Sequence, residues 1–274
     1  MTLRDALKAA AARLAPLSAT PRLDAELLAA HALGVTREAM ILSYLEEAAP
    51  EGLEPLVARR LAQEPVAYIL GEADFWTLTL GVSPAVLIPR ADSETLIEAA
   101  LDAFALRPPA SILDLGTGSG ALLLAALSEW PLAAGLGVDQ SDEALAIARA
   151  NAVRTGLAGR ARFQQGDWGQ GLEAVFDLIL CNPPYIAQGF PLAADVAAHE
   201  PHTALFAGPD GLDDYRLLAP QIAALLAPGG VACVEIGFDQ AVSAGALFSA
   251  QGLALEVRRD LGGRDRCLVL RKKA

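Results

Sequence analysis

The second half of this 274-residue sequence contains an asparagine followed by two prolines and a tyrosine: Asn182, Pro183, Pro184 and Tyr185. The apolar run 178–181 before them is typical of a buried strand, so we expect Asn182 at the carboxyl end of a sheet. The amide oxygen of Asn182 and the carbonyl of Pro183 could accept the two N–H groups of a planar nitrogen and aim it at an electrophile. The prolines stiffen the turn, and Tyr185 can stack on a flat amide or base. These residues are therefore candidates for a site that alkylates an amide or amine.

A glycine-rich turn lies about 65 residues earlier, between a predicted buried strand at 111–115 and a predicted helix at 121–129. The turn consists of Gly116, Thr117, Gly118, Ser119 and Gly120. Glycine permits φ > 0 and lets the backbone lie against a ligand where a Cβ would intrude. The spacing lacks both the Gly-x-Gly-x-x-Gly of a dinucleotide site and the Gly-Lys-Ser/Thr of a phosphate loop. It resembles the first motif of S-adenosylmethionine (SAM) methyltransferases, and Asn-Pro-Pro-Tyr resembles the target-amine motif of such enzymes.

Further candidate residues follow other predicted strands, because ligands of doubly wound sheets bind at the carboxyl ends of the strands. Asp139 ends the second strand of the series, where its carboxylate could accept from both ribose hydroxyls. It could instead be a cap or turn residue before Ser141. Asp167 and Trp168 follow the third strand, where they could hydrogen-bond and stack on adenine. We count Asn182 as a cofactor-binding residue too, since its amide would lie beside the methyl donor.

Residues 90–274 alternate predicted strands and helices, which is typical of an α/β doubly wound sheet with right-handed crossovers. With the motifs above, we expect a Rossmann-like SAM-dependent methyltransferase domain. Its last two strands, 254–258 and 267–271, should form a hairpin that makes one edge antiparallel. The helix that opens the domain is expected to be capped by Asp92 or Ser93.

Two smaller parts are expected before this domain. In residues 74–89 the hydrophobic pattern changes to the two-residue period of a β-strand. This segment predicts a linking β-hairpin with strands on both sides of 81–84. Phe75 and Trp76 either line the mouth of the active site or pack at a domain junction, and the sequence favours neither. Residues 1–73 carry apolar side chains at helical spacing and predict a small helical bundle, which we interpret as a substrate-recognition domain.

Composition limits the partners. The chain has 33 acidic and 21 basic residues and a formal net charge of −12. Proteins that grip nucleic acid gain much of their affinity from Lys and Arg that neutralise phosphates, so nucleic acid is not expected as the main partner. No apolar run approaches the roughly 18 to 20 uncharged residues of a membrane span, and no membrane partner is expected. Charges at helical spacing in the first 15 residues argue against a signal peptide.

The cysteines and histidines do not predict a metal site. Cys181, Cys233 and Cys267 each lie in an apolar, strand-like run, and we interpret them as buried hydrophobes in a reducing compartment. A cytoplasmic monomer is expected. His199 and His202 lie near the asparagine motif in sequence but are interpreted as exposed loop residues, because the proposed chemistry needs no histidine base.

Together these residues resemble the HemK/PrmC family, whose members methylate the glutamine of the Gly-Gly-Gln motif in class-1 peptide-chain release factors. The resemblance extends over nearly the whole chain, with similar segments at 22–28, 65–71, 86–90, 235–237 and 260–266. It implies methyl transfer from SAM to the side-chain amide nitrogen N5 of that glutamine, in support of translation termination. It also implies that 182–185 bind the glutamine, while 116–120, Asp139 and Trp168 bind SAM. Ala91 departs from the family, which typically has proline after Pro-Arg, a residue that would make that turn more rigid.

Two alternatives stay open. The same motif could hold the exocyclic amine of adenine or guanine, so the substrate could be DNA or RNA; the acidic composition and the helical N-terminal part argue against this. A non-catalytic SAM-binding assembly protein is the second alternative. The intact Asn-Pro-Pro-Tyr argues against it, because a binding module does not need an amide acceptor beside the methyl donor.

Overall fold

The computed structural model describes residues 1–273, and its contacts divide the chain into two compact units. The first unit comprises Met1–Glu72 and Leu192–Glu200. The second comprises Ala73–Pro191 and the chain from Pro201 onward. Among the described residues, no helix has the length and apolarity that a membrane span requires.

The first unit is helical. Its helices are α1 (Leu3–Leu14), α2 (Pro21–Leu33), α3 (Arg37–Ser43), α4 (Leu53–Leu61), α5 (Val66–Leu70) and α9 (Ala194–His199). Local sequence sets the ends of several helices: Pro21 is the first residue of α2, Gly34 ends it in the left-handed conformation, and the Thr36 side chain caps α3. The core includes the fully buried Leu7 and Leu28. The helical bundle predicted from the sequence is therefore present, but α9 was not predicted.

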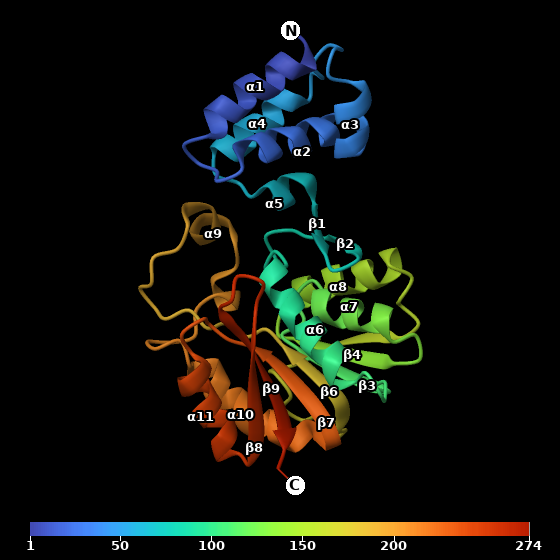
Figure 1. Cartoon of the computed structure of the whole chain (residues 1–274), viewed down its shortest axis with the longest axis vertical. Helices are drawn as coiled ribbons and strands as arrows, with labels where there is room; N and C mark the ends of the chain where they lie inside the picture. The colour runs from blue at the N-terminus through green and yellow to red at the C-terminus, as the bar shows by residue number, and fades with distance from the viewer. Residues whose placement is uncertain (274) are drawn as a thin grey trace. The chain divides into compact units, whose positions relative to one another are not determined.

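The second unit is built on a seven-stranded sheet with the order β5-β4-β3-β6-β7-β9-β8 (Figure 1). Its strands are β3 (Ser111–Leu115), β4 (Ala134–Asp139), β5 (Ala161–Gln165), β6 (Phe176–Cys181), β7 (Leu226–Glu235), β8 (Leu253–Arg259) and β9 (Asp265–Lys272). Neighbouring strands from β5 to β7 in this order are parallel, whereas β9 is antiparallel to both β7 and β8. The predicted doubly wound sheet with an antiparallel edge is confirmed.

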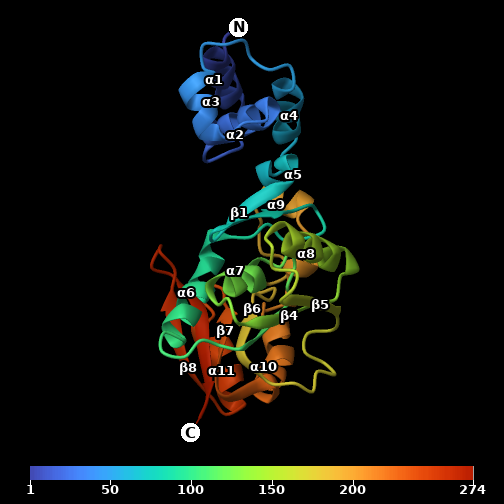
Figure 2. The same cartoon turned by 90° about the vertical axis from the view of Figure 1, so that its right-hand side faces the viewer.

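Helices cover both faces of this sheet (Figure 2). They are α6 (Glu94–Ala103), α7 (Ala121–Glu129), α8 (Asp142–Arg154), α10 (Asp213–Leu225) and α11 (Ala241–Ala250), with short 3-10 helices η1 (Ala91–Ser93) and η2 (His202–Ala204). Successive strand residues point to opposite faces. Ile112 and Leu178 thus join the core under α6 and α7, whereas Leu113 and Ile179 join the core under α10 and α11.

The hairpin differs from the prediction. It consists of β1 (Glu72–Phe75) and β2 (Leu78–Gly81), so its turn lies at Trp76 and Thr77, and the predicted second strand at 85–88 is absent from the described chain. Trp76 has a φ of 57°, a left-handed conformation that is uncommon for a residue other than glycine and that no local sequence pattern predicts. Two hydrogen bonds hold it there: its backbone N–H donates to Glu94 at 2.8 Å and its indole N–H donates to Glu129 at 2.7 Å. Trp76 therefore packs and bonds within the second unit.

Candidate functional site

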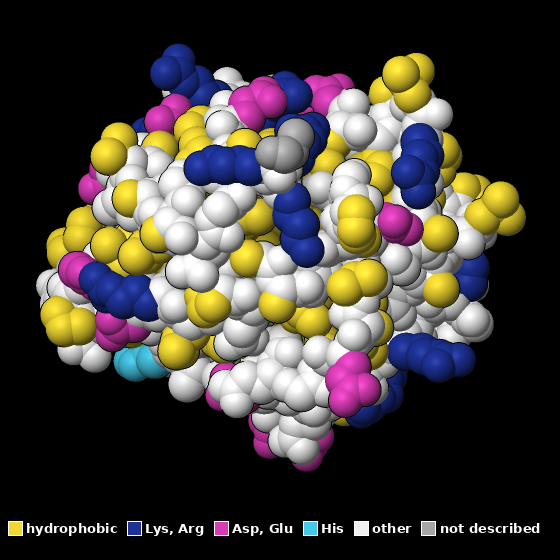
Figure 3. Space-filling view, turned by 90° about the horizontal axis from the view of Figure 1, so that it is seen from below, with side chains coloured by type: hydrophobic (Ala, Val, Ile, Leu, Met, Phe, Trp, Pro, Cys, Tyr) yellow, Lys and Arg dark blue, Asp and Glu magenta, His cyan; other side chains and the backbone are white. Residues whose placement is uncertain are grey.

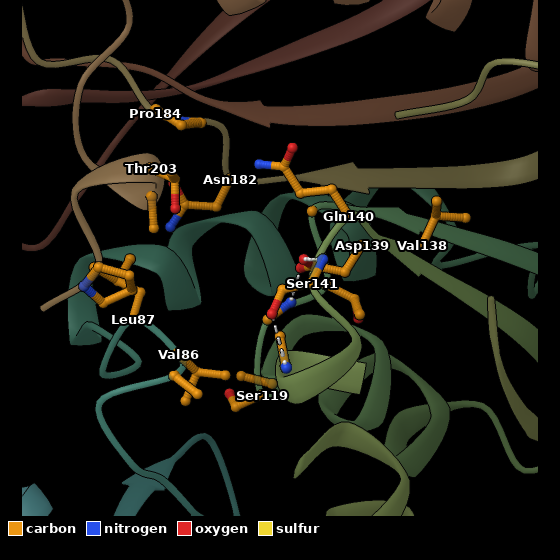
Figure 4. Close-up of a pocket in the computed structure, with 18 of the residues that line it drawn as sticks. Val86, Leu87, Ser119, Val138, Asp139, Gln140, Ser141, Asn182, Pro184 and Thr203 are labelled. Carbon is orange, nitrogen blue, oxygen red and sulfur yellow. Dashed lines mark hydrogen bonds between the residues drawn. The ribbon is translucent and has the colours of Figure 1, made fainter. Parts of the chain in front are cut away.

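The candidate site lies where the strand order reverses. From β3 the chain continues through β4 to β5 on one side and then returns to β6 on the other side of β3. In doubly wound sheets, ligands bind at this switch point, at the carboxyl ends of the strands. A cavity of about 440 Å³ lies there, a size that suits a small-molecule ligand (Figure 4). Its lining includes Phe75, Val86, Leu87, Gly116, Thr117, Gly118, Ser119, Asp139, Asp167, Trp168, Asn182 and Pro184.

The glycine-rich turn has the backbone conformation that its glycines permit. Gly116, Gly118 and Gly120 have φ values of 73°, 53° and 83°, a region that other residues rarely adopt. A Cβ on Gly116 would lie 2.9 Å from the Trp168 ring. The turn therefore requires glycine at Gly116 both for its conformation and for the close approach of the indole. Gly120 and the buried Ser119 lead directly into α7.

Asp139 contacts the glycine-rich turn directly. Its carboxylate accepts hydrogen bonds from the backbone N–H of Gly118 at 2.8 Å and of Ser141 at 2.9 Å. Ser141 itself caps α8, accepting from the N–H of Ala144 at 3.2 Å. The Asp139 carboxylate thus accepts hydrogen bonds from backbone N–H groups of two turns in this structure. Asp139 also lines the cavity, as a residue that binds ribose hydroxyls must. Figure 4 shows Asp139 and Ser141 on a different side of the cavity from Val86 and Leu87.

Asp167 and Trp168 line the same cavity from the loop after β5. Asp167 is exposed and accepts a hydrogen bond from Gln170 at 2.6 Å. Trp168 is half-buried, with a φ of 52°, and packs against the core under α10. Burial raises the pKa of the Asp214 carboxyl, and a hydrogen bond from Trp168 opposes this rise. Asp214 on α10 was not predicted, and it lines the same cavity.

Asn182 is held by a serine that the sequence analysis assigned to another role. Its Nδ2 donates to Ser93 Oγ at 3.1 Å, and Ser93 Oγ donates to Glu235 Oε2 at 2.5 Å. Ser93 precedes α6 but makes no capping hydrogen bond, so its predicted role as a cap was wrong. Its hydroxyl instead turns to Glu235, because a buried carboxylate needs donors. Asp92 is no cap either; it pairs with Arg266 at 3.1 Å.

The remaining residues of the motif differ in exposure. Pro183 and Pro184 are both buried, whereas Tyr185 is half-buried. Of these three residues, only Pro184 lines the cavity. The hydroxyl of Tyr185 donates to Glu235 Oε1 at 3.2 Å. Burial, followed by the nearby charge of Glu235, raises the pKa of Tyr185, so it remains a phenol. Burial also raises the pKa of Glu235 to about 7, although hydrogen bonds from Ser93 and Tyr185 and the charge of Arg266 lower it.

Asp114 is a second buried carboxyl group, below the glycine-rich turn. It is 1 % exposed and accepts a hydrogen bond from Thr117 Oγ1 at 2.6 Å. Burial raises its pKa to about 7, opposed by the Thr117 hydroxyl and the Leu123 amide and reinforced by Asp139. Asp114 lies in the strand predicted at 111–115, and the sequence analysis gave it no role of its own.

Asn151 on α8 is a further residue that the sequence analysis missed. It is 2 % exposed, and its Oδ1 accepts from the Gly81 N–H at 2.7 Å. Its Nδ2 donates to the carbonyls of Gly81 at 3.0 Å and Ser119 at 2.9 Å. It thereby joins the end of the hairpin to the glycine-rich turn. No sequence signal distinguishes it from an exposed helical asparagine.

The histidines and cysteines were outside the predicted chemistry. His202 is exposed in η2, whereas His199 is half-buried at the end of α9. Cys181, Cys233 and Cys267 are free thiols and are buried, as predicted. Residues 1–273 contain no group of three or more His, Cys, Asp or Glu side chains arranged to hold a metal ion.

Comparison with known proteins gives the family. Residues 5–71 match the PrmC N-terminal domain, and residues 107–242 match a methyltransferase domain. A protein of Rhodospirillum rubrum named release factor glutamine methyltransferase is 46% identical over 260 residues, which is 93% of this chain and 80% of that protein. A protein of the same name from Cereibacter sphaeroides is 41% identical over 281 residues and covers 100% of both chains.

A solved structure shares the fold. The crystal structure of a methyltransferase from Pyrococcus furiosus aligns with a TM-score of 0.55 at 18% identity, covering 79% of this chain and 98% of that one. At this identity the likeness supports the fold alone. The sequence relatives, by contrast, cover both units at high identity, and the chain belongs to the family of release factor glutamine methyltransferases.

Proposed function

We propose that this protein transfers a methyl group from SAM to the side-chain amide nitrogen N5 of the glutamine in the Gly-Gly-Gln motif of class-1 peptide-chain release factors. This reaction supports translation termination. The observation that carries the proposal is the position of Asn182, whose amide lines the same cavity as the glycine-rich turn in a chain of this family. A nitrogen acceptor and a methyl-donor site are thus neighbours.

The residues present fit SAM. The glycine-rich turn offers a backbone that can lie against the ligand, and the amino end of α7 follows it near the expected place of the ligand carboxylate. Asp139 supplies an acceptor for ribose, and Trp168 supplies an apolar face for adenine. When bound, SAM supplies an electrophilic methyl group: the C–N bond forms as the C–S bond breaks, its electron pair stays on sulfur, and the nitrogen releases one proton to water.

The protein must overcome the weak nucleophilicity of an amide, whose nitrogen lone pair is delocalised into its carbonyl group. The Asn182 amide oxygen and the Pro183 carbonyl accept the two N–H groups of the substrate glutamine, which orients the nitrogen. These acceptors also stabilise the positive charge that develops on the nitrogen in the transition state. Tyr185 and Pro184 border the flat amide. No residue of the chain needs to act as a strong base.

The main partner is a release factor rather than nucleic acid, and the protein acts as a cytoplasmic monomer. The net charge of −12 supports a protein substrate, because phosphate backbones are bound by clustered Lys and Arg. On the face seen in Figure 3, several Lys and Arg side chains lie near one another in the upper middle, and the others lie apart among hydrophobic, uncharged and acidic groups. The basic side chains therefore do not form a continuous track for a phosphate backbone across this face.

Mass spectrometry of an unmethylated release factor incubated with this protein and SAM tests the proposal. Peptide mapping should find the mass of one added methylene on the glutamine of the Gly-Gly-Gln loop. A release factor with that glutamine replaced by asparagine should stay unmodified and serves as the control. If SAM binds but the glutamine is not modified, the proposal is wrong, and adenine or guanine amines in nucleic acid become the next substrates to test.

A further inference from the structure

The Ser93 hydroxyl connects Asn182 to a carboxylate that lies outside both sequence motifs. Ser93 Oγ donates to Glu235 Oε2 at 2.5 Å and accepts from Asn182 Nδ2 at 3.1 Å. Ser93 is 4 % exposed and Glu235 is 1 % exposed, so bulk water does not compete for these bonds. The three side chains come from η1, from the carboxyl end of β6 and from the last residue of β7.

The single proton of the Ser93 hydroxyl fixes the direction of both bonds. While that proton is donated to an ionised Glu235, Oγ can only accept from Asn182, so the amide nitrogen faces Ser93. The amide oxygen of Asn182 is then the atom that remains free to accept a hydrogen bond from a ligand in the cavity. A substrate amide presents two N–H donors, so it needs an acceptor at this point and is repelled by a donor.

We propose that Glu235 is a positioning residue for methyl transfer, which acts through Ser93 to hold the Asn182 carboxamide with its oxygen toward the substrate nitrogen. This inference rests on the proposed function, because it assigns Ser93 and Glu235 to the same site. Tyr185 is held by the same carboxylate, since its hydroxyl donates to Glu235 Oε1 at 3.2 Å. One buried group thus orients both polar side chains of the motif.

An ion pair supports the turn that carries Ser93. Arg266 on β9 pairs with Asp92 at 3.1 Å and with Asp260 at 3.3 Å, and it donates to the carbonyl of Ile236 at 3.3 Å. These contacts tie η1 to the residue that follows Glu235. The turn at Ala91 is therefore braced by ionic contacts.

Protonation of Glu235 reverses the direction of donation in the hydrogen bonds that join Glu235, Ser93 and Asn182. A carboxylic acid can donate to Ser93 Oγ, which frees the serine proton to be donated to the Asn182 oxygen. The amide would then turn its nitrogen toward the substrate. Burial raises the pKa of Glu235 to about 7, so this change falls in an accessible pH range. The other titratable or charged groups that face Glu235 from neighbouring elements are Tyr185, Arg266, Asp92, Tyr215, Cys181 and Cys267.

The test begins with Ser93→Ala and Glu235→Gln, assayed for release-factor methylation at saturating SAM. Each variant should lower kcat by about 10- to 100-fold, because the acceptor is misplaced, while the SAM dissociation constant stays within about twofold of wild type. The double variant should be no slower than the slower single variant, since both changes remove one hydrogen-bonded unit. Losses that multiply in the double variant would overturn the inference.

Ser111 offers a matched control at the opposite end of the sheet. Its hydroxyl donates to Asp177 Oδ2 at 3.2 Å, so Ser111→Ala also removes a serine–carboxylate hydrogen bond, but at the amino ends of β3 and β6. Ser111→Ala should keep kcat within about threefold of wild type. If it lowers kcat as much as Ser93→Ala, the effect of Ser93 is a general loss of structure and the inference is wrong.

The pH profile of kcat gives a readout that a purely structural role would not change. Wild-type kcat should fall as pH drops below about 7, where Glu235 gains its proton. Ser93→Ala should lose this acid limb, because the link to Asn182 is cut, and Glu235→Gln should lose it for lack of a titrating group. An acid limb that persists in Ser93→Ala overturns the inference, even if Glu235→Gln fails to fold.

Wild-type activity distinguishes the two proposals. If the wild-type protein methylates no release factor, the proposed function fails. If it methylates the glutamine and Ser93→Ala does so at the same kcat, the proposed function stands and only the role of Ser93 and Glu235 is wrong.

Discussion

The buried Asp114 carboxyl should make the SAM-free protein less stable as pH rises, and Asp114→Asn should remove this loss. Burial raises the pKa of Asp114 from 3.8 to about 7. A carboxyl with a raised pKa binds its proton more tightly in the folded state, so stability is lost as pH rises through the interval between these two values. At about 1.4 kcal/mol per pH unit, the interval corresponds to a loss of up to about 4 kcal/mol. Asparagine stays neutral and can still accept from Thr117.

Urea unfolding of wild type and Asp114→Asn without SAM measures the effect. At about pH 5 Asp114 is still protonated in the folded protein but already ionised in the unfolded chain, so the variant should be more stable by only about 1.5 kcal/mol. At about pH 8 the variant should be more stable by about 2 to 4 kcal/mol. Comparing the two proteins cancels the contributions of Glu235 and of other titrating groups. A difference that is the same at both pH values would refute the reasoning.

Three further substitutions test the site. Asn182→Ala should lower kcat by about 100-fold or more and leave SAM binding largely intact, because only the substrate amide loses its acceptor; equal turnover would contradict the mechanism. Asp139→Ala should weaken SAM binding about 10- to 100-fold by calorimetry, and an unchanged dissociation constant would remove Asp139 from the site. Gly116→Ala puts a Cβ 2.9 Å from the Trp168 ring and should lower both the melting temperature and the SAM affinity. Gly229→Ala, also at positive φ but facing open space, is its control, and equal losses would exclude the ring contact as the cause.

Local sequence located those parts of the site that lie within one segment. Strand β3 and helix α7 have the bounds that were predicted, because an apolar run, a glycine-rich turn and a helical run follow one another directly. The hairpin was misplaced by several residues. Its turn depends on the hydrogen bonds from Trp76 to Glu94 and Glu129, which lie 18 and 53 positions away and leave no local pattern.

Helix α10 shows that a proline does not always end a helix. Pro220 lies inside it, and a proline in a helix usually signals an end or a kink. The buried Tyr215, Leu218 and Ile222 nevertheless have helical spacing, a signal that the sequence analysis did not use. Tertiary packing of this face overrides the proline.

Contacts between distant positions could not be predicted. Ser93 lies 89 positions from Asn182 and 142 from Glu235, and a serine before a helix is ordinarily a cap. Only the assembled sheet brings the end of β6 and the end of β7 beside η1. The sequence therefore pointed to the residues proposed to meet the ligands, while the residues that orient them became visible in the structure.

Asn151 links two walls of the cavity that belong to distant parts of the chain. Its amide bonds Gly81 on one side and Ser119 on the other, and the segment just after Gly81 contributes Val86 and Leu87 to the cavity. A displacement of the glycine-rich turn on ligand entry must either break these bonds or pull the end of the hairpin with it. Entry of the methyl donor and the shape of the opposite wall are therefore mechanically coupled through one side chain.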